Sequence, residues 1–158
     1  MKRMITAMVY NQVGVLSRIS SVLYRRQVNI ESISVGQTED KEISRITFVI
    51  SVTNLAEVEQ VTKQLNKQIA VVKVSDITDD PHLERELALV KVNAPASTRT
   101  EIKTMIEPFR ADIVDVGLKT IAVQIAGSSE KVDACIDILR PYGIKEMART
   151  GITGFTRG

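Results

Sequence analysis

The sequence has little of the chemistry from which most catalytic and metal sites are built. Its 158 residues include one cysteine, Cys135, one histidine, His82, and no tryptophan, and aromatic residues make up only 4% of the chain. A single cysteine excludes a disulfide within one chain, and one Cys and one His are too few for a His/Cys metal cluster. The structural interpretations, a solvated connecting residue for His82 and a small buried residue for Cys135, are favoured over catalytic ones.

Charge and hydropathy exclude two further classes of protein. The 21 Lys and Arg residues nearly balance 19 Asp and Glu residues, so the net charge of +2 offers no broad electrostatic footprint for nucleic acid or an anionic membrane. No apolar run approaches the roughly 18 residues that span a bilayer. The opening segment MKRMITAMVY has a short apolar run without a small-residue cleavage site, which favours a strand over a signal peptide. We therefore expect a cytoplasmic protein.

Apolar periodicity predicts the same order of elements twice. In the first half, the predicted strands are 2–10, 28–37, 42–52 and 69–76, and the predicted helices are 14–26 and 54–67. In the second half, the predicted strands are 86–93, 111–117, 119–126 and 143–149, and the predicted helices are 98–109 and 129–139. Each half is βαββαβ, so the predicted fold class is α+β with two ferredoxin-like domains in tandem. The predicted division is a first domain of residues 1–77, a linker of 78–85 and a second domain of 86–158.

This element order predicts that one face of each sheet lacks helices. In the first strand, apolar residues lie on both sides, with Met4 and Met8 on one side and Ile5 on the other. An uncovered apolar face favours association, so the chain is expected to be at least a dimer. The tail TGITGFTRG is interpreted as a mobile terminus. The bare face and the tail are both candidate contacts for a partner protein.

The segment NQVGVL places a glycine turn directly before a predicted helix. The N–H groups and positive dipole end of a helix N-terminus fit a carboxylate or phosphate, and a glycine lets a ligand approach the backbone. Because the helix returns the chain antiparallel to the first strand, Asn29 is expected at the same end of the sheet as Asn11. The candidate residues for binding a small amino acid with a hydrocarbon side chain are Asn11, Gly14, Val15, Leu16, Asn29 and Ile30. From spacing alone, the structural interpretation, in which these residues only form turns, is favoured.

Two other function classes fit the element order less well. An RNA-recognition fold stacks bases on aromatic residues of its central strands, and the corresponding strand here, ISRITFVISV, has a single aromatic residue. An enzyme needs a nucleophile with its base or paired carboxylates in a cleft, and the only histidine lies in the predicted linker. Small-molecule sensing is the class that the turn before the first helix favours.

Longer motifs point to a family. The segment NQVGVLSRISSVLYRRQVNIESISVG resembles the signature of ACT domains, which sense amino acids. Together with SRITFVISV, HLERELALVKVNA, FRADIVDVG and IKEMARTGITG, it makes the chain resemble the regulatory (small) subunits of acetolactate synthase, also called acetohydroxyacid synthase. The resemblance extends from about residue 2 to the C-terminus.

The resemblance implies a non-catalytic regulatory subunit that works with a large catalytic subunit in branched-chain amino-acid biosynthesis. It implies that thiamine diphosphate, magnesium and FAD belong to the catalytic partner, and that this chain holds no cofactor. It also implies activation of the large subunit, and a homodimer in which ACT domains pair edge to edge with valine or another branched-chain amino acid bound between them. No nucleic acid and no membrane is expected.

The resemblance also assigns roles to particular residues. Four residues, Asn11, Gly14, Val15 and Leu16, match the ligand loop of the family. Asn29 and Ile30 match the part contributed by the neighbouring chain. Family members often have proline where this chain has Val13. Because proline presets φ near −65°, its absence is expected to loosen the loop and weaken ligand binding. The alternative function is a free-standing ACT-type amino-acid sensor that controls another protein.

Overall fold

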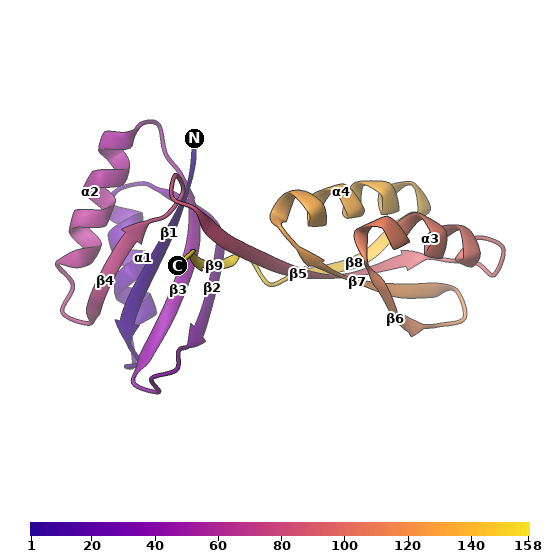
Figure 1. Ribbon diagram of the computed structural model, residues 1–158, viewed down its shortest axis with the longest axis horizontal. Helices are drawn as coiled ribbons and strands as arrows, with labels where there is room; N and C mark the ends of the chain where they lie inside the picture. Colours follow the sequence, from indigo (N-terminus) through magenta and orange to yellow (C-terminus); the bar gives the residue numbers. More distant parts are fainter. The chain divides into compact units, whose positions relative to one another are not determined.

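The computed structural model describes residues 1–158 as two compact units. Unit 1 consists of Met1–Leu83 and Gly151–Gly158, and unit 2 consists of Glu84–Thr150. The chain therefore passes between the units twice, once within β5 and once before the C-terminal tail. In Figure 1, the two helices of each unit lie on one face of that unit's sheet.

Unit 1 has the predicted βαββαβ order. Its elements are β1 (Lys2–Tyr10), α1 (Val15–Arg25), β2 (Asn29–Gln37), β3 (Ile43–Ser51), α2 (Leu55–Asn66) and β4 (Val71–Asp76). The sheet has the order β2-β3-β1-β4, and all neighbouring strands are antiparallel. Strands β2 and β4 are therefore the edges of the main sheet.

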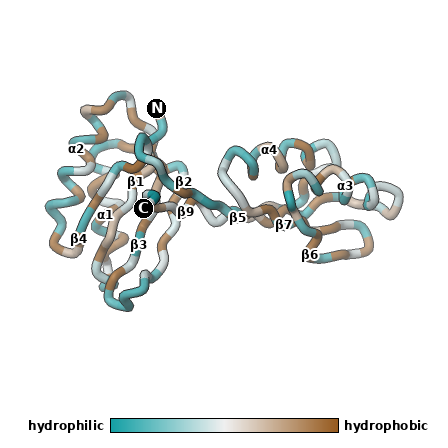
Figure 2. Tube along the Cα trace, viewed as in Figure 1, coloured by the Kyte–Doolittle hydropathy of each residue, from teal (hydrophilic) through white to brown (hydrophobic).

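The core of unit 1 lies between the helices and one face of the sheet. α1 buries Val15, Ile19, Val22 and Leu23, as its 3.6-residue periodicity predicts. On the strands, alternate residues such as Ile5 and Phe48 enter the same cluster. Apolar and polar segments alternate along α2 and β4 in Figure 2. Local periodicity is thus sufficient to predict this side of the sheet.

The opposite face of the unit 1 sheet is partly covered by the C-terminal tail. The tail contains strand β9 (Thr153–Thr156), which pairs with β5 (His82–Asn93). A small apolar cluster on this face consists of Met4, Val49, Ile77 and Ile152. Only 9% of Ile152 is exposed. The face predicted to be bare is therefore covered in part by the tail. The sequence did not predict this contact, because an isolated isoleucine in a Gly- and Thr-containing segment has no periodicity that reveals its burial.

Unit 2 repeats the βαββαβ order with one 3-10 turn after each helix. Besides the remainder of β5, its elements are α3 (Arg99–Ile106), η1 (Glu107–Phe109), β6 (Asp112–Val116), β7 (Thr120–Gly127), α4 (Ser129–Leu139), η2 (Arg140–Tyr142) and β8 (Ile144–Arg149). The strand order is β6-β7-β5-β8. The prediction of an α+β fold with two ferredoxin-like units is confirmed.

The boundaries of the units differ from the predicted division. The segment after β4, predicted as a free linker from residue 78, is attached to unit 1: the Met4 N–H donates to Thr78 Oγ1 at 2.8 Å, and Arg3 Nη2 donates to Asp79 Oδ2 at 2.7 Å. β5 already begins at His82. The tail from Gly151, predicted as part of the second domain, belongs to unit 1. These differences depend on contacts between residues that are distant in the sequence.

Candidate functional site

The end of β1 is a turn whose asparagine side chain remains available. The Asn11 N–H donates to Glu42 O at 2.7 Å, which ties the turn to the β2–β3 connection. The exposed Asn11 side chain makes one contact, from Nδ2 to Lys41 O at 3.4 Å. That distance is long for an N–H···O hydrogen bond. Since an amide offers two donor hydrogens and an acceptor oxygen, most of its hydrogen-bonding capacity is free for a ligand.

Gly14 connects this turn to α1 in a left-handed conformation. Its φ of 84° and ψ of −1° lie where residues with a side chain are disfavoured. A Cβ built on Gly14 would meet no atom within 4 Å. Glycine is therefore required here for its backbone conformation, and the space beside it is open.

The N-terminus of α1 has no side-chain cap, and the one contact that the protein makes with its first N–H group is a long one, from the Val15 N–H to Gln12 O at 3.5 Å. Its first turn contains no acidic residue. In contrast, Asn54 caps α2 by accepting from the Glu57 N–H at 3.0 Å, and Ser128 caps α4 by accepting from the Lys131 N–H at 3.3 Å. The first N–H groups of a helix have no intrahelical partner and carry the positive end of its dipole. This end of α1 therefore suits a bound carboxylate.

The apolar residues of the turn divide between core and solvent. Val15 is 4% exposed and packs in the core of unit 1, so it offers a ligand only backbone atoms. Leu16 is 48% exposed, and Val13 is fully exposed. Of the predicted pair Val15 and Leu16, only Leu16 presents an apolar side chain at the surface.

Asn29 lies at the opposite end of the sheet from Asn11, so the prediction that they share one end is wrong for a single chain. Asn29 pairs with Ser51, and Ser51 pairs with Lys2, the first residue of β1. Asn11 instead follows Tyr10, the last residue of β1. At about 3.3 Å per residue, the length of β1 separates the two ends by roughly 26 Å. The reason is that α1 returns the chain to the start of β1, so β2 runs parallel to β1.

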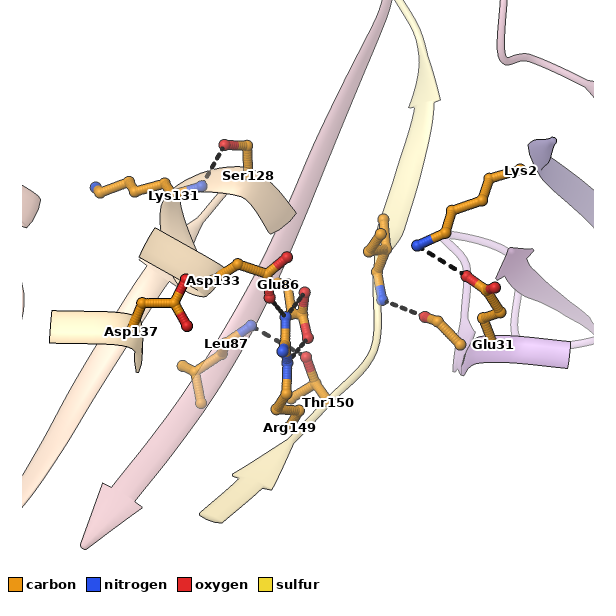
Figure 3. A network of polar contacts seen from close by, with 12 residues as sticks. Lys2, Glu31, Glu86, Leu87, Ser128, Lys131, Asp133, Asp137, Arg149 and Thr150 are labelled. Atoms are coloured by element: carbon orange, nitrogen blue, oxygen red, sulfur yellow. Dashed lines mark hydrogen bonds and ion pairs between the residues drawn. The ribbon is translucent and has the colours of Figure 1, made fainter. Parts of the chain in front are cut away.

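A buried ion pair in unit 2 joins two motifs to which sequence reasoning gave no role. Arg149 Nε donates to Glu86 Oε1 at 2.6 Å and Nη2 to Glu86 Oε2 at 3.0 Å, while Asp133 Oδ1 lies 2.8 Å from Nη2 (Figure 3). The Glu86 side chain is 5% exposed. Hydrogen bonds from Arg149 to Glu86, and then to Asp133, raise the pKa of the guanidinium. Each charge is paired, so the cluster has no free acid or base.

The two residues with potential nucleophilic or metal-binding chemistry are placed elsewhere. Cys135 is fully buried in unit 2, and burial raises the pKa of its thiol to about 11, which disfavours the reactive thiolate. His82 begins β5, with Nδ1 2.8 Å from Asp80 O. No group of three His, Cys, Asp or Glu residues is arranged to hold a metal ion. None of the helices has the length and apolar character needed to cross a membrane.

Similarity to known proteins extends over the whole chain. Residues 5–73 match the family described as the AHAS small subunit-like ACT domain, and residues 85–158 match the family described as the small subunit of acetolactate synthase. The acetolactate synthase small subunit of Bacillus subtilis strain 168 is 58% identical over all of this chain and 92% of its own length. The small subunit of Lactococcus lactis subsp. lactis strain IL1403 is 54% identical over the full length of both chains.

A solved structure has the same fold throughout. The crystal structure of the acetolactate synthase small subunit from Thermotoga maritima has a TM-score of 0.89 at 34% identity, and the similarity covers all of this chain and 98% of that one. The two family matches, the full-length relatives and this structure agree with one another. The chain belongs to the family of acetolactate synthase small subunits.

Proposed function

We propose that this chain is a non-catalytic regulatory subunit that activates the large catalytic subunit of acetolactate synthase and makes it sensitive to valine. The observation that carries the proposal is the uncapped, acid-free N-terminus of α1, which follows the left-handed Gly14 and the exposed amide of Asn11. The helix end is suited to the valine carboxylate. The Asn11 amide is suited to the ammonium group, and Leu16 to the hydrocarbon side chain.

The site is completed by a second copy of the chain. β2 is an edge strand with unpaired backbone groups, and Ile33 and Val35 on it are 37% and 52% exposed. If two copies of β2 pair antiparallel about Ile33, Asn29 of the second copy lies opposite Gln37 of the first. Gln37 pairs with Ser44.

This pairing moves Asn29 of the second copy to the correct end of the sheet. Ser44 pairs with Val9, two residues before Asn11. Asn29 and Ile30 of one copy then lie at the end of the sheet where Asn11 and Gly14 of the other copy lie. The same register that separates these residues within one chain supports their meeting between two chains. A ligand held in this way stabilises the dimer.

Inhibition follows from linkage between ligand binding and the arrangement of the pair. Valine stabilises one mutual arrangement of two ACT domains, and it inhibits only if that arrangement is less favourable for turnover in the large subunit. Couplings of this type are about 1–3 kcal/mol, or roughly 5- to 150-fold in affinity. Thiamine diphosphate, magnesium and FAD are assigned to the large subunit, and no cofactor to this chain. Val13 is fully exposed and occupies the position at which family members often have proline. Because proline would fix φ, the loop with Val13 is less restricted and binds valine more weakly than a loop with proline would.

Calorimetry and reconstitution test the proposal together. Valine, leucine and isoleucine are titrated into the purified chain, with alanine and aspartate as controls. The chain is also added to the large subunit with thiamine diphosphate, magnesium, FAD and pyruvate. We expect valine to bind, acetolactate formation to rise on adding the chain, and valine to reverse that rise. Acetolactate formation by the chain alone, or the absence of binding by any branched-chain amino acid, refutes the proposal.

A further inference from the structure

The tail leaves one half of the helix-free face of the unit 1 sheet uncovered. Alternate residues of β1 point to this face. Met4, near the start of the strand, belongs to the apolar cluster that contains Ile152 of the tail. Farther along, Met8 is half-buried, and Tyr10, the last residue of the strand, is 43% exposed. The uncovered half therefore lies at the end of the sheet where the turn with Asn11 begins.

Two cations border the apolar side chains of this half. Met8 pairs with Arg45 on β3 and with Lys73 on β4, and cross-strand partners point to the same face of a sheet. The next pair on this face is Tyr10 and Ile43. The two rows contain no acidic residue, although acidic and basic residues are nearly balanced in the whole chain. The basic face is defined here as Met8, Tyr10, Ile43, Arg45 and Lys73.

The cations of the basic face have no partner within the chain. Arg3, on the same sheet, pairs with Asp76 at 2.8 Å. In contrast, neither Arg45 nor Lys73 makes an ion pair or a side-chain hydrogen bond. Their strands lie on either side of β1, so their Cα atoms are about 10 Å apart at a strand spacing of about 4.8 Å. Two uncompensated charges of one sign on one surface suit a partner that carries carboxylates.

The proposed pairing of two copies through β2 leaves the basic face free. Ile33 pairs with Phe48, which lies in the core under the helices. A pairing about Ile33 therefore places the helices of both copies on one side of the joined sheet, and both basic faces on the other side. Stacking two such surfaces would bring Arg45 and Lys73 of one pair against those of another, which like-charge repulsion disfavours. A further copy of the chain is therefore a poor occupant of this surface.

We propose that the basic face is the surface on which this chain docks the large catalytic subunit, through a segment that carries both carboxylate and apolar side chains. This inference rests on the proposed function for the identity of the partner. The carboxylates pair with Arg45 and Lys73, and the apolar side chains contact the apolar residues between them. Apolar side chains rimmed by charged ones are typical of protein interfaces. Because Tyr10 directly precedes Asn11, the docking surface adjoins the proposed valine site.

Charge reversal tests the docking surface. The full-length chain is titrated into the large subunit loaded with thiamine diphosphate, magnesium and FAD, without valine, for the parent, Arg45→Glu and Lys73→Glu. Each reversal turns an attraction into a repulsion and is expected to weaken binding about tenfold. Because added salt screens exposed charges, the affinity of the parent should also fall more steeply with added salt than the affinity of either variant.

Lys63→Glu is the matched control. Lys63 is exposed on α2, which covers the other face of the sheet, and the substitution changes the net charge by the same amount. This variant should bind the large subunit within about threefold of the parent. All three variants alone should sediment as the parent does and bind valine within about threefold of the parent. Circular dichroism checks folding, and the exposed Lys73 on an edge strand keeps the test decisive if Arg45→Glu folds poorly.

The outcomes separate this inference from the proposed function. If Arg45→Glu or Lys73→Glu is folded and binds the large subunit as the parent does, or if Lys63→Glu loses as much affinity, the docking surface is overturned alone. A change of oligomeric state in the basic-face variants would show that the face joins copies of this chain, and would also overturn the inference. A parent chain that does not bind the large subunit overturns the proposed function and this inference with it.

Discussion

Replacing Gly14 by aspartate should greatly weaken valine binding without unfolding the protein. The substitution adds a carboxylate beside the free N–H groups at the start of α1, where the valine carboxylate is proposed to bind. The open space beside Gly14 accommodates the added atoms, since nothing lies within 4 Å of a built Cβ. The change therefore acts through charge and backbone conformation, and not through a clash.

The expected magnitudes separate binding from folding. A side chain at φ +84° is disfavoured by roughly 1–2 kcal/mol, and less for Asp or Asn, which visit this region more readily. A negative charge at a helix N-terminus stabilises the folded chain by about 0.3–1 kcal/mol, which offsets part of this cost. Two unit charges about 5 Å apart repel by about 3 kcal/mol at an effective dielectric constant near 20. Since 1.4 kcal/mol is tenfold in affinity, valine should bind Gly14→Asp about 200-fold more weakly.

Gly14→Asn is the matched control. It has the same shape and the same backbone strain but no charge, so it should keep most of the valine affinity while its stability falls by about 1 kcal/mol. Both variants are compared with the parent by calorimetric titration of valine, by urea unfolding, and by valine inhibition of the reconstituted enzyme. If Gly14→Asp is folded and binds valine within threefold of Gly14→Asn, no carboxylate binds at the start of α1.

Three other measurements address stability and assembly. Arg149→Met should lower the free energy of unfolding by about 3–5 kcal/mol, because it leaves the Glu86 carboxylate buried without its partner. Lys91→Met removes one member of an exposed pair and should change the free energy of unfolding by less than about 1 kcal/mol. Equal losses for the two variants in urea unfolding would contradict this prediction. Cys135 should not react with a thiol reagent at pH 8 until the chain unfolds, and rapid labelling of the folded chain would refute its burial. Because the pKa of Cys135 in the folded chain, about 11, lies above the ordinary 9.0, the contribution of this thiol to stability should fall as the pH rises between these values. The chain should sediment as a dimer with a melting temperature that rises with protein concentration and with valine, and a valine-insensitive monomer at micromolar concentration would exclude the β2 interface.

The sequence by itself determined the helices, the strands of both βαββαβ units and the side of each sheet that the helices cover, but not β9. Helical and strand periodicities depend only on neighbouring residues, so α1 and its buried face were predicted to within a residue or two. The turn was also a local feature: the sequence placed Gly14 directly before a predicted helix, and the structure has Gly14 in the left-handed conformation immediately before α1. These features required no knowledge of which strands pair.

Only the tertiary structure decided where distant residues meet. Asn29 lies at the other end of the sheet from Asn11 because strand direction and register, and not spacing, determine which ends coincide. Ser34 and Ile152 are separated by 118 residues, and the hydrogen bond between them leaves no periodic signal in either segment. The same holds for Glu86 and Arg149, whose burial as a pair depends on the pairing of β5 with β8. Contacts of this kind depend on the packing of the whole sheet, so the pattern of apolar residues along the chain does not specify them.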